Sequence, residues 1–114
     1  MKIMVVGVCA SGKSTLVGKL QEKGYDACNI AQEHSCVKRL WLKRKPDLLI
    51  VLDATLMTVQ KRRRERWTQE HIDIQHDRLS DARSHADLYL LTDKLTPIEV
   101  LSIVVDFIES RQCD

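Results

Sequence analysis

The feature that most restricts the fold is a glycine pattern placed directly after a short apolar run near the start of the chain. Residues 2–8 are a continuous run of mostly β-branched apolar side chains, which predicts a strand buried on both faces of a parallel sheet. The pattern G-x-x-x-x-G-K-[ST] begins at Gly7, and from Lys13 to Lys23 apolar side chains recur at helical spacing before Gly24. The sequence therefore predicts a strand, a glycine loop and a helix in immediate succession.

This spacing of residue types is suited to holding phosphate groups. Glycine at Gly7 and Gly12 lets backbone N–H groups turn inward around a phosphate, where a side chain would obstruct the approach. Lys13 is expected to reach the β- and γ-phosphates, Ser14 to ligate Mg²⁺, and Thr15 to lie near the α-phosphate. The amides expected to form the cradle are those of Ala10, Ser11, Gly12 and Lys13. They lie at the start of a helix whose dipole favours anions, so we expect a purine nucleoside triphosphate, ATP with Mg²⁺, as the bound cofactor.

A chance match is the alternative interpretation of the glycine pattern. At average residue frequencies of roughly 6 to 7%, a random chain of this length shows the pattern about once in a few hundred cases. The pattern also carries a structural requirement, since a strand must precede it and a helix must follow it. Both are predicted here, which favours phosphate binding.

Strands and helices alternate along the rest of the chain, which predicts parallel βαβ units with right-handed crossovers. Further strands are expected at residues 26–31, 47–53 and 87–91. Helices are expected at residues 35–45, in two parts between residues 55 and 86 with a break near residues 70–74, and after the capping pattern of Thr96, Pro97 and Glu99. We therefore predict one domain over residues 1–114, a three-layer α/β/α P-loop fold with a small, mostly parallel sheet of about four strands.

Charge and cysteine content further limit the partners and the compartment that we expect for this protein. The 18 basic residues are nearly balanced by 16 acidic ones, so no global field favours nucleic acid, and the basic run at residues 61–66 suits either a polyanionic ligand or a solvated helix face. The four cysteines lack zinc-like spacing and no export signal is present, which indicates reduced thiols. No stretch reaches the roughly 20 apolar residues of a membrane span. We therefore expect a cytoplasmic protein without a membrane partner, and the charge balance does not favour nucleic acid as a partner.

Two stretches beyond the loop resemble P-loop nucleoside and nucleotide kinases. PDLLIVLDAT and the Arg-rich helix after it, residues 46–66, resemble the fourth strand and lid helix of thymidylate and deoxynucleoside kinases. ADLYLLTDKLTPIEVLSIVVDFIE, residues 86–109, resembles the final strand and helix of shikimate-kinase-like and adenylate-kinase-like proteins. Of the three similarities, only the loop is a highly specific motif.

The resemblance implies a minimal kinase-like phosphotransferase that acts on an unidentified acceptor. It implies that Arg62 is a lid arginine that neutralises charge on the transferring phosphoryl group, with Arg64 and Arg66 near enough to share that role. Glu33 matches the place of a carboxylate that acts as a base or as a water-mediated Mg²⁺ partner. The implied catalytic residues are Lys13, Glu33, Arg62 and Arg66.

Some assignments within this resemblance have alternatives. Gln32 and His34 compete with Glu33 for the same place in the chain. Asp53 ends an apolar strand, which is the pattern of a Mg²⁺-binding carboxylate that would act with Ser14, but the kinase resemblance favours a structural role in capping the next helix.

The chain also departs from these kinases, because it lacks the strand and helices that usually bind the phosphoryl acceptor. We expect the surface near Glu33, His34, Arg39 and Trp41 to replace them, alone or completed by a second subunit in a homodimer. Three other functions remain open. They are a non-catalytic nucleotide-binding module, an ATPase or GTPase switch without an NKxD guanine reader, and nucleic-acid binding through residues 61–66.

Overall fold

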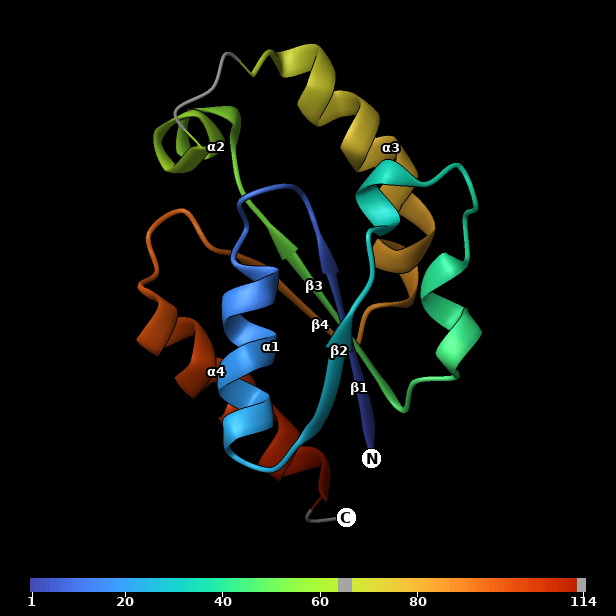
Figure 1. Cartoon of the computed structure of the whole chain (residues 1–114), viewed down its shortest axis with the longest axis vertical. Coiled ribbons are helices and arrows are strands. Elements are labelled where there is room, and N and C mark those ends of the chain that lie inside the picture. Colours follow the sequence, from blue (N-terminus) through green and yellow to red (C-terminus); the bar gives the residue numbers. More distant parts are fainter. Residues whose placement is uncertain (64–66, 113–114) are drawn as a thin grey trace.

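A four-stranded parallel sheet forms the centre of the protein in the computed structural model, which describes residues 1–63 and 67–112 (Figure 1). The strands are β1 (Lys2–Gly7), β2 (Asp26–Asn29), β3 (Leu48–Asp53) and β4 (Leu88–Leu91). Their order in the sheet is β2-β1-β3-β4, and every neighbouring pair is parallel. The predicted α/β class and the four predicted strands are thus confirmed.

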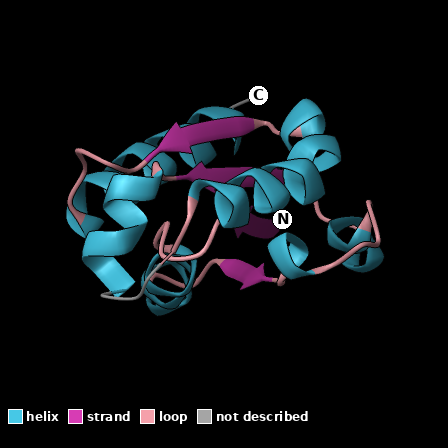
Figure 2. Cartoon of the chain, turned by 90° about the horizontal axis from the view of Figure 1, so that it is seen from above, coloured by secondary structure: helices cyan, strands magenta, loops and turns pink. Residues whose placement is uncertain are grey.

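Helices cover both faces of this sheet (Figures 1 and 2). The α-helices are α1 (Lys13–Glu22), α2 (Leu56–Arg63), α3 (Gln69–His85) and α4 (Pro97–Gln112). Two short 3₁₀ helices, η1 (Gln32–His34) and η2 (Leu40–Arg44), lie in the connection between β2 and β3. Within residues 1–63 and 67–112, none of the helices is both long and apolar enough to cross a bilayer.

The central strands β1 and β3 are buried on both faces because they are apolar at nearly every position, whereas the edge strands β2 and β4 are only partly buried. Successive side chains of a strand point to opposite faces. Ile3 and Val5 of β1 therefore pack with α1 and α4, whereas Met4 and Val6 pack with α3. The continuous apolar runs that predict buried strands are thus divided between two separate hydrophobic clusters.

The path of the chain creates a switch point at the carboxyl edge of the sheet. β2 and β3 are consecutive strands, yet they lie on opposite sides of β1. In open α/β sheets, ligands bind outside the carboxyl ends of the strands where the order reverses in this way. The glycine-rich loop, residues 8–12, leaves β1 at this point and leads into α1 (Figure 1).

The predicted helix at residues 35–45 is wrong, because only the short η2 forms there. The buried Gln32 side chain donates to the Val37 carbonyl at 2.7 Å and accepts from the Trp41 amide at 3.0 Å. The Ser35 hydroxyl accepts from the Val37 amide at 3.0 Å. Polar side chains thus satisfy backbone groups that an α-helix would have paired internally.

The predicted break near residues 70–74 is also wrong, because α3 runs without interruption from Gln69 to His85. Its N-cap is Thr68, whose hydroxyl accepts from the His71 amide, while the His71 ring accepts from the Thr68 amide at 3.2 Å. A histidine thus stands where the sequence signature of this capping box has glutamate or glutamine. The capping box predicted at α4 is confirmed, since the Glu99 amide donates to the Thr96 hydroxyl at 3.2 Å and Glu99 accepts from the Thr96 amide at 3.0 Å.

Candidate functional site

Close packing and a left-handed backbone explain both glycines of the glycine-rich pattern. A Cβ atom at Gly7 would lie 2.2 Å from the Leu52 carbonyl oxygen and 2.8 Å from Ser11 Oγ, so a side chain here would collide with β3 and with the loop. Gly12 has φ of 100°, in the left-handed region that glycine adopts without strain. Ala10 also lies in that region, at φ of 60°, and so stores some strain in the loop.

The start of α1 is suited to an anion. Its N-cap is Gly12, which offers no side chain to accept from the first amides, and its first turn carries no acidic residue. The first N–H groups of any helix lack intrahelical partners and carry the positive end of the dipole. Ser14 and Thr15 are exposed in this first turn. Of the amides predicted to form the cradle, that of Ser11 donates within the loop, to the Val8 carbonyl at 3.2 Å.

The Lys13 ammonium lies against the glycine-rich loop and the start of η1. It donates to the Gly7 carbonyl at 2.8 Å and to the Val8 carbonyl at 3.2 Å, and it forms an ion pair with Glu33 Oε2. The Lys13 and Glu33 side chains are only 11% and 5% exposed. Because both groups are largely desolvated, removing either one would leave the other buried without its partner. The structure thus brings together two of the predicted catalytic residues.

Two buried polar atoms beside this ion pair lack partners. Among the residues that the structure describes, the buried side-chain atoms without a hydrogen bond are Ser11 Oγ and Glu33 Oε1. Such atoms are uncommon in native proteins, and leaving one unpaired costs roughly 1 to 3 kcal/mol. Both atoms are therefore positions at which a ligand would recover a hydrogen bond or an ionic contact.

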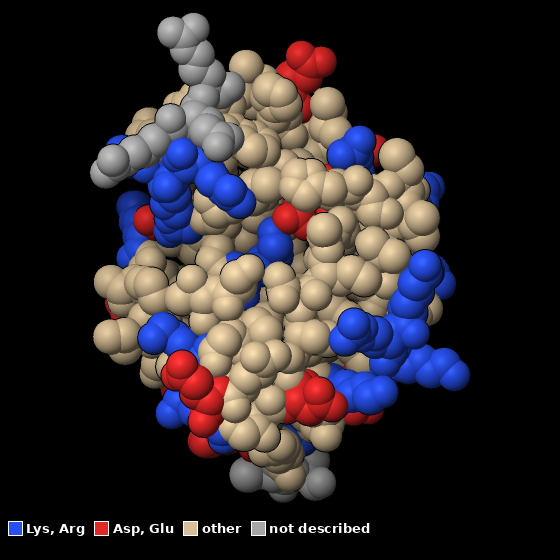
Figure 3. Space-filling view, viewed as in Figure 1, with Lys and Arg blue, Asp and Glu red and all other residues tan. Residues whose placement is uncertain are grey.

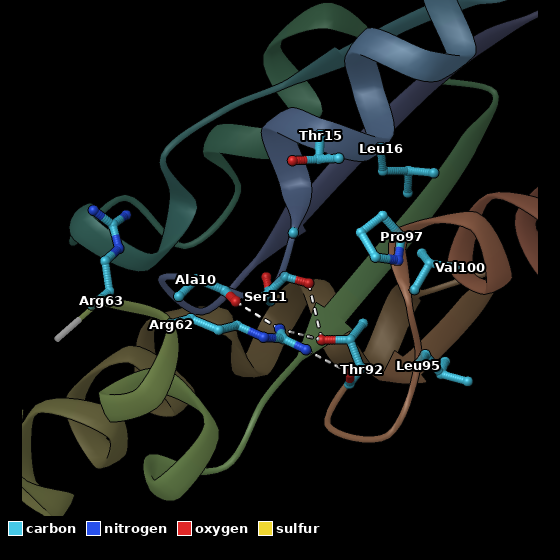
Figure 4. Close-up of a pocket in the computed structure, with 11 residues that line it drawn as sticks. Ala10, Ser11, Thr15, Leu16, Arg62, Arg63, Thr92, Leu95, Pro97 and Val100 are labelled. Atoms are coloured by element: carbon cyan, nitrogen blue, oxygen red, sulfur yellow. Dashed lines mark hydrogen bonds between the residues drawn. The ribbon is translucent and has the colours of Figure 1, made fainter.

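Arg62 connects α2 to the glycine-rich loop and to the end of β4 (Figure 4). Its Nη1 donates to the Ala10 carbonyl at 2.7 Å and to Thr92 Oγ1 at 3.0 Å, and its Nη2 donates to the Thr92 carbonyl at 2.7 Å. The Thr92 hydroxyl in turn donates to the Ser11 carbonyl at 3.0 Å. The predicted lid arginine thus lies on the loop, whereas Arg64 and Arg66 lie outside the described residues.

A cavity of about 510 Å³ opens beside these groups, within the size range of ligand pockets (Figure 4). One side is polar and is formed by the loop, the start of α1 and the end of α2. The other side is apolar and is formed largely by α1 and by the segment from β4 into α4. The residues that line it are Ala10, Ser11, Gly12, Thr15, Leu16, Arg62, Arg63, Thr92, Leu95, Pro97 and Val100.

Basic side chains gather around this edge of the molecule. Lys61, Arg62 and Arg63 form the last turn of α2, and the face in Figure 3 shows Lys and Arg side chains over α2. The positive field beside the glycine-rich loop favours an anionic ligand.

The Asp53 carboxylate is engaged with three donors. It accepts from the Ala54 amide at 2.8 Å, from His76 Nε2 at 2.9 Å and from the Tyr89 hydroxyl at 2.5 Å. Burial, and then the hydrogen bond to Asp53, raise the pKa of Tyr89 to about 12. These contacts tie α3 and β4 to the end of β3, which is a structural role, while a metal-binding role of Asp53 stays a prediction.

Other residues predicted near the site have contacts elsewhere. Trp41 is buried and donates from Nε1 to Asp81 at 3.1 Å, and Arg39 pairs with the same carboxylate at 3.4 Å. Both side chains thus dock η2 and the residue before it onto α3. The predicted acceptor surface is therefore reduced to Glu33 and the exposed His34, and its role stays a prediction.

Sequence reasoning missed three residues that shape the site. Thr92 is a polar residue directly after a strand at the same edge as the loop, so its position carried a usable signal. Cys9 and Gln75 carried none, because they are 66 residues apart and only the packing of α3 on the sheet brings them together.

The protein is thus an α/β protein with a parallel sheet, a glycine-rich loop and a cavity at the carboxyl edge of that sheet, and this fold class does not by itself specify a function. No protein-family model matches this chain, and no curated protein shows significant similarity to it.

Proposed function

We propose that this protein binds ATP with Mg²⁺ at residues 7–15 and is a kinase-like phosphotransferase. The observation that carries the proposal is the position of Gly7, the glycine-rich loop and Lys13 together at the switch point, directly before a helix start without acidic residues. Oriented amides, a helix dipole and one ammonium group are the features that recognise a polyphosphate.

The cavity supports a nucleoside triphosphate over a free polyphosphate. Its polar side adjoins the loop, where the phosphates would bind, and its apolar side includes Leu95, Pro97 and Val100, against which a purine ring would pack. Lys13 would exchange its contact with Glu33 for the β- and γ-phosphates. The release of Glu33 would then leave its carboxylate available to the metal or to the acceptor.

The residues that would hold Mg²⁺ are Ser14, directly through its hydroxyl, and Glu33 through water. The unpartnered Glu33 Oε1 fits this role, since Mg²⁺ prefers oxygen ligands and keeps several waters. When bound, Mg²⁺ neutralises charge on the β- and γ-phosphates. Asp53 suits this role less well, because three donors already share its carboxylate.

In the transfer step, an acceptor oxygen forms a bond to the γ-phosphorus while the bond to the bridging oxygen breaks and ADP leaves. The proton of the acceptor passes to Glu33 or to water. Arg62, which already lies on the Ala10 carbonyl, would stabilise the charge on the transferring group. Positioning and electrostatics account for most of the catalysis in such reactions.

Calorimetric titration of ATP with Mg²⁺ tests the proposal. Lys13→Ala is expected to weaken ATP binding roughly 10- to 100-fold, because it removes charge-assisted hydrogen bonds to the phosphates. The double variant Lys13→Ala/Glu33→Gln removes both charges and avoids leaving a buried carboxylate unpaired. Lys23→Ala, at the other end of α1, is the matched control and should bind like the wild type. Wild-type protein that does not bind ATP would overturn the proposal.

A non-catalytic nucleotide-binding module is the second candidate. It is favoured because Asp53 already accepts three hydrogen bonds and because Arg39 and Trp41 contact Asp81 of α3. Few polar groups are then left to bind a phosphoryl acceptor. A phosphate-release assay separates the two functions. Slow release that Arg62→Ala abolishes supports the phosphotransferase, whereas ATP binding without any release supports the module.

A further inference from the structure

Three side chains with metal-ligating atoms converge on the α3 side of the glycine-rich loop. Cys9 Sγ, an oxygen of Glu33 and a ring nitrogen of His34 all lie within 4.8 Å of one another. Cys9 Sγ is 3.2 Å from His34 Nε2, and His34 Nε2 is 4.0 Å from Glu33 Oε2. With bonds of about 2.3 Å to sulfur and about 2.1 Å to nitrogen or oxygen, ligands around one tetrahedral ion are separated by similar distances.

The surroundings of Cys9 fix its sulfur in place. The Cys9 amide donates to Gln75 Oε1 at 2.9 Å, and Gln75 Nε2 donates back to Cys9 Sγ at 3.3 Å. Both residues are buried. An outer hydrogen bond of this kind orients a metal ligand and partly balances the charge of a thiolate.

Glu33 supplies the second, independent observation. Its side chain is 5% exposed, one oxygen pairs with Lys13, and the other has no partner among residues 1–63 and 67–112. The oxygen 4.0 Å from His34 Nε2 is Oε2, the one paired with Lys13, so a metal bound there would share that oxygen with the ammonium or displace it, while Oε1 offers a further bond. His34, with its side chain 54% exposed, provides the route from solvent.

We propose that Cys9, Glu33 and His34 form a site for a divalent transition metal of the zinc type. One thiolate, one imidazole and one carboxylate suit Zn²⁺ and its neighbours, whereas Mg²⁺ takes oxygen ligands. The Cys9 thiol releases its proton to solvent as the metal–sulfur bond forms. Three protein ligands leave a fourth position for water or another small ligand. This site shares Glu33 with the Mg²⁺ site of the proposed function, but it differs in taking Cys9 and His34 as ligands.

Titration with Co²⁺ under reducing, oxygen-free conditions and without nucleotide tests this site. Thiolate ligation produces a sulfur-to-metal charge-transfer band, and a tetrahedral site produces strong visible bands. We expect both at one Co²⁺ per chain, with displacement by Zn²⁺. Cys9→Ser should remove the charge-transfer band, and His34→Ala and Glu33→Gln should each weaken affinity roughly 10- to 100-fold or more.

Serine substitutions at Cys28, Cys36 and Cys113 are the matched controls and should leave the spectrum unchanged. A wild-type protein without the charge-transfer band, or a band that persists in Cys9→Ser, overturns the proposal. His34→Ala decides the matter if Cys9→Ser fails to fold, because His34 is exposed and its loss leaves the core intact. The result is independent of the proposed function, since a protein that never binds ATP can still give the Co²⁺ spectrum.

Discussion

The two faces of the sheet are built differently. The face covered by α1 and α4 packs around an apolar cluster that includes Leu20 and Ile108, both fully buried, and the buried polar residues on this side, Ser11 and Thr92, lie at the cavity. The face covered by α3 also holds an apolar cluster, but buried polar residues lie around its margins. Those that contact α3 or belong to it are Gln32, Glu33, Asp53 and Gln75.

The two faces therefore have different roles, because one mainly stabilises the sheet and the other positions polar side chains. Apolar burial is non-directional, so the α1 and α4 face stabilises the sheet mainly through packing. Buried hydrogen bonds are directional and costly to leave unmade, so the α3 face determines where side chains such as Cys9 and Asp53 point. We therefore expect substitutions on the two faces to have different consequences.

The largest effect is expected on the apolar face. Ile108→Ala should lower the free energy of unfolding by roughly 2 to 5 kcal/mol, because it removes buried methyl groups and leaves a cavity. Urea denaturation measures this loss. Ile103→Ala, on the same helix but 37% exposed, is the control and should cost roughly 1 kcal/mol or less. A change in the pKa of Tyr89 in Ile108→Ala would show that the two faces are coupled and would contradict their separate roles.

A smaller and more local effect is expected at Gln32. Gln32→Leu deprives the Trp41 amide and the Val37 carbonyl of their partners, which should cost roughly 1 to 3 kcal/mol. Hydrogen exchange should accelerate at Trp41 more than in β1. Gln21→Leu serves as the control, because Gln21 is exposed and donates to a single carbonyl. Uniform acceleration across the sheet would contradict a positioning role.

The smallest effect is expected from substitution of Asp53, and it is a change in the pKa of Tyr89. Asp53→Asn should lower the pKa of Tyr89 from about 12 toward the ordinary value of 10.0, while burial, the larger cause, keeps it above that value. Tyrosinate absorbance against pH measures the shift, and Tyr89→Phe assigns the transition. An unchanged pKa would mean that the Asp53 hydrogen bond has no part in it.

The raised pKa of Tyr89 also determines how its contribution to the stability of the wild type depends on pH. The unfolded chain releases the tyrosine proton near pH 10.0, before the folded chain does near pH 12. The contribution of Tyr89 is therefore fully present below pH 10.0 and is lost as the pH rises toward 12.

Sequence patterns were sufficient for the strands and for the loop. Continuous apolar runs predict β1 and β3, and the glycine spacing predicts the loop and α1, because each depends on neighbours in the chain. The segment around η1 and η2 could not be predicted in this way. Its conformation depends on one buried glutamine, Gln32, that contacts two backbone groups within the segment and the distant Arg78 carbonyl of α3.

The same division holds for the candidate site. Gly7, Gly12, Lys13 and Ser14 follow from the local pattern, and Arg62 donates to the Ala10 carbonyl of the loop, while its role as a lid arginine stays a prediction. The pairing of Cys9 with Gln75 and His34 arises only when α3 and η1 pack onto the sheet. Local pattern therefore identifies the loop, and tertiary contacts determine its environment.

The tight approach of Gly7 to the Leu52 carbonyl has a consequence for protein engineering. The start of the loop fits only against β3 at its present spacing from β1, since a Cβ at Gly7 would lie 2.2 Å from that oxygen. Grafting residues 7–15 onto another parallel sheet would transfer the sequence without the strand against which it fits. A transplant must therefore carry β3 together with the loop.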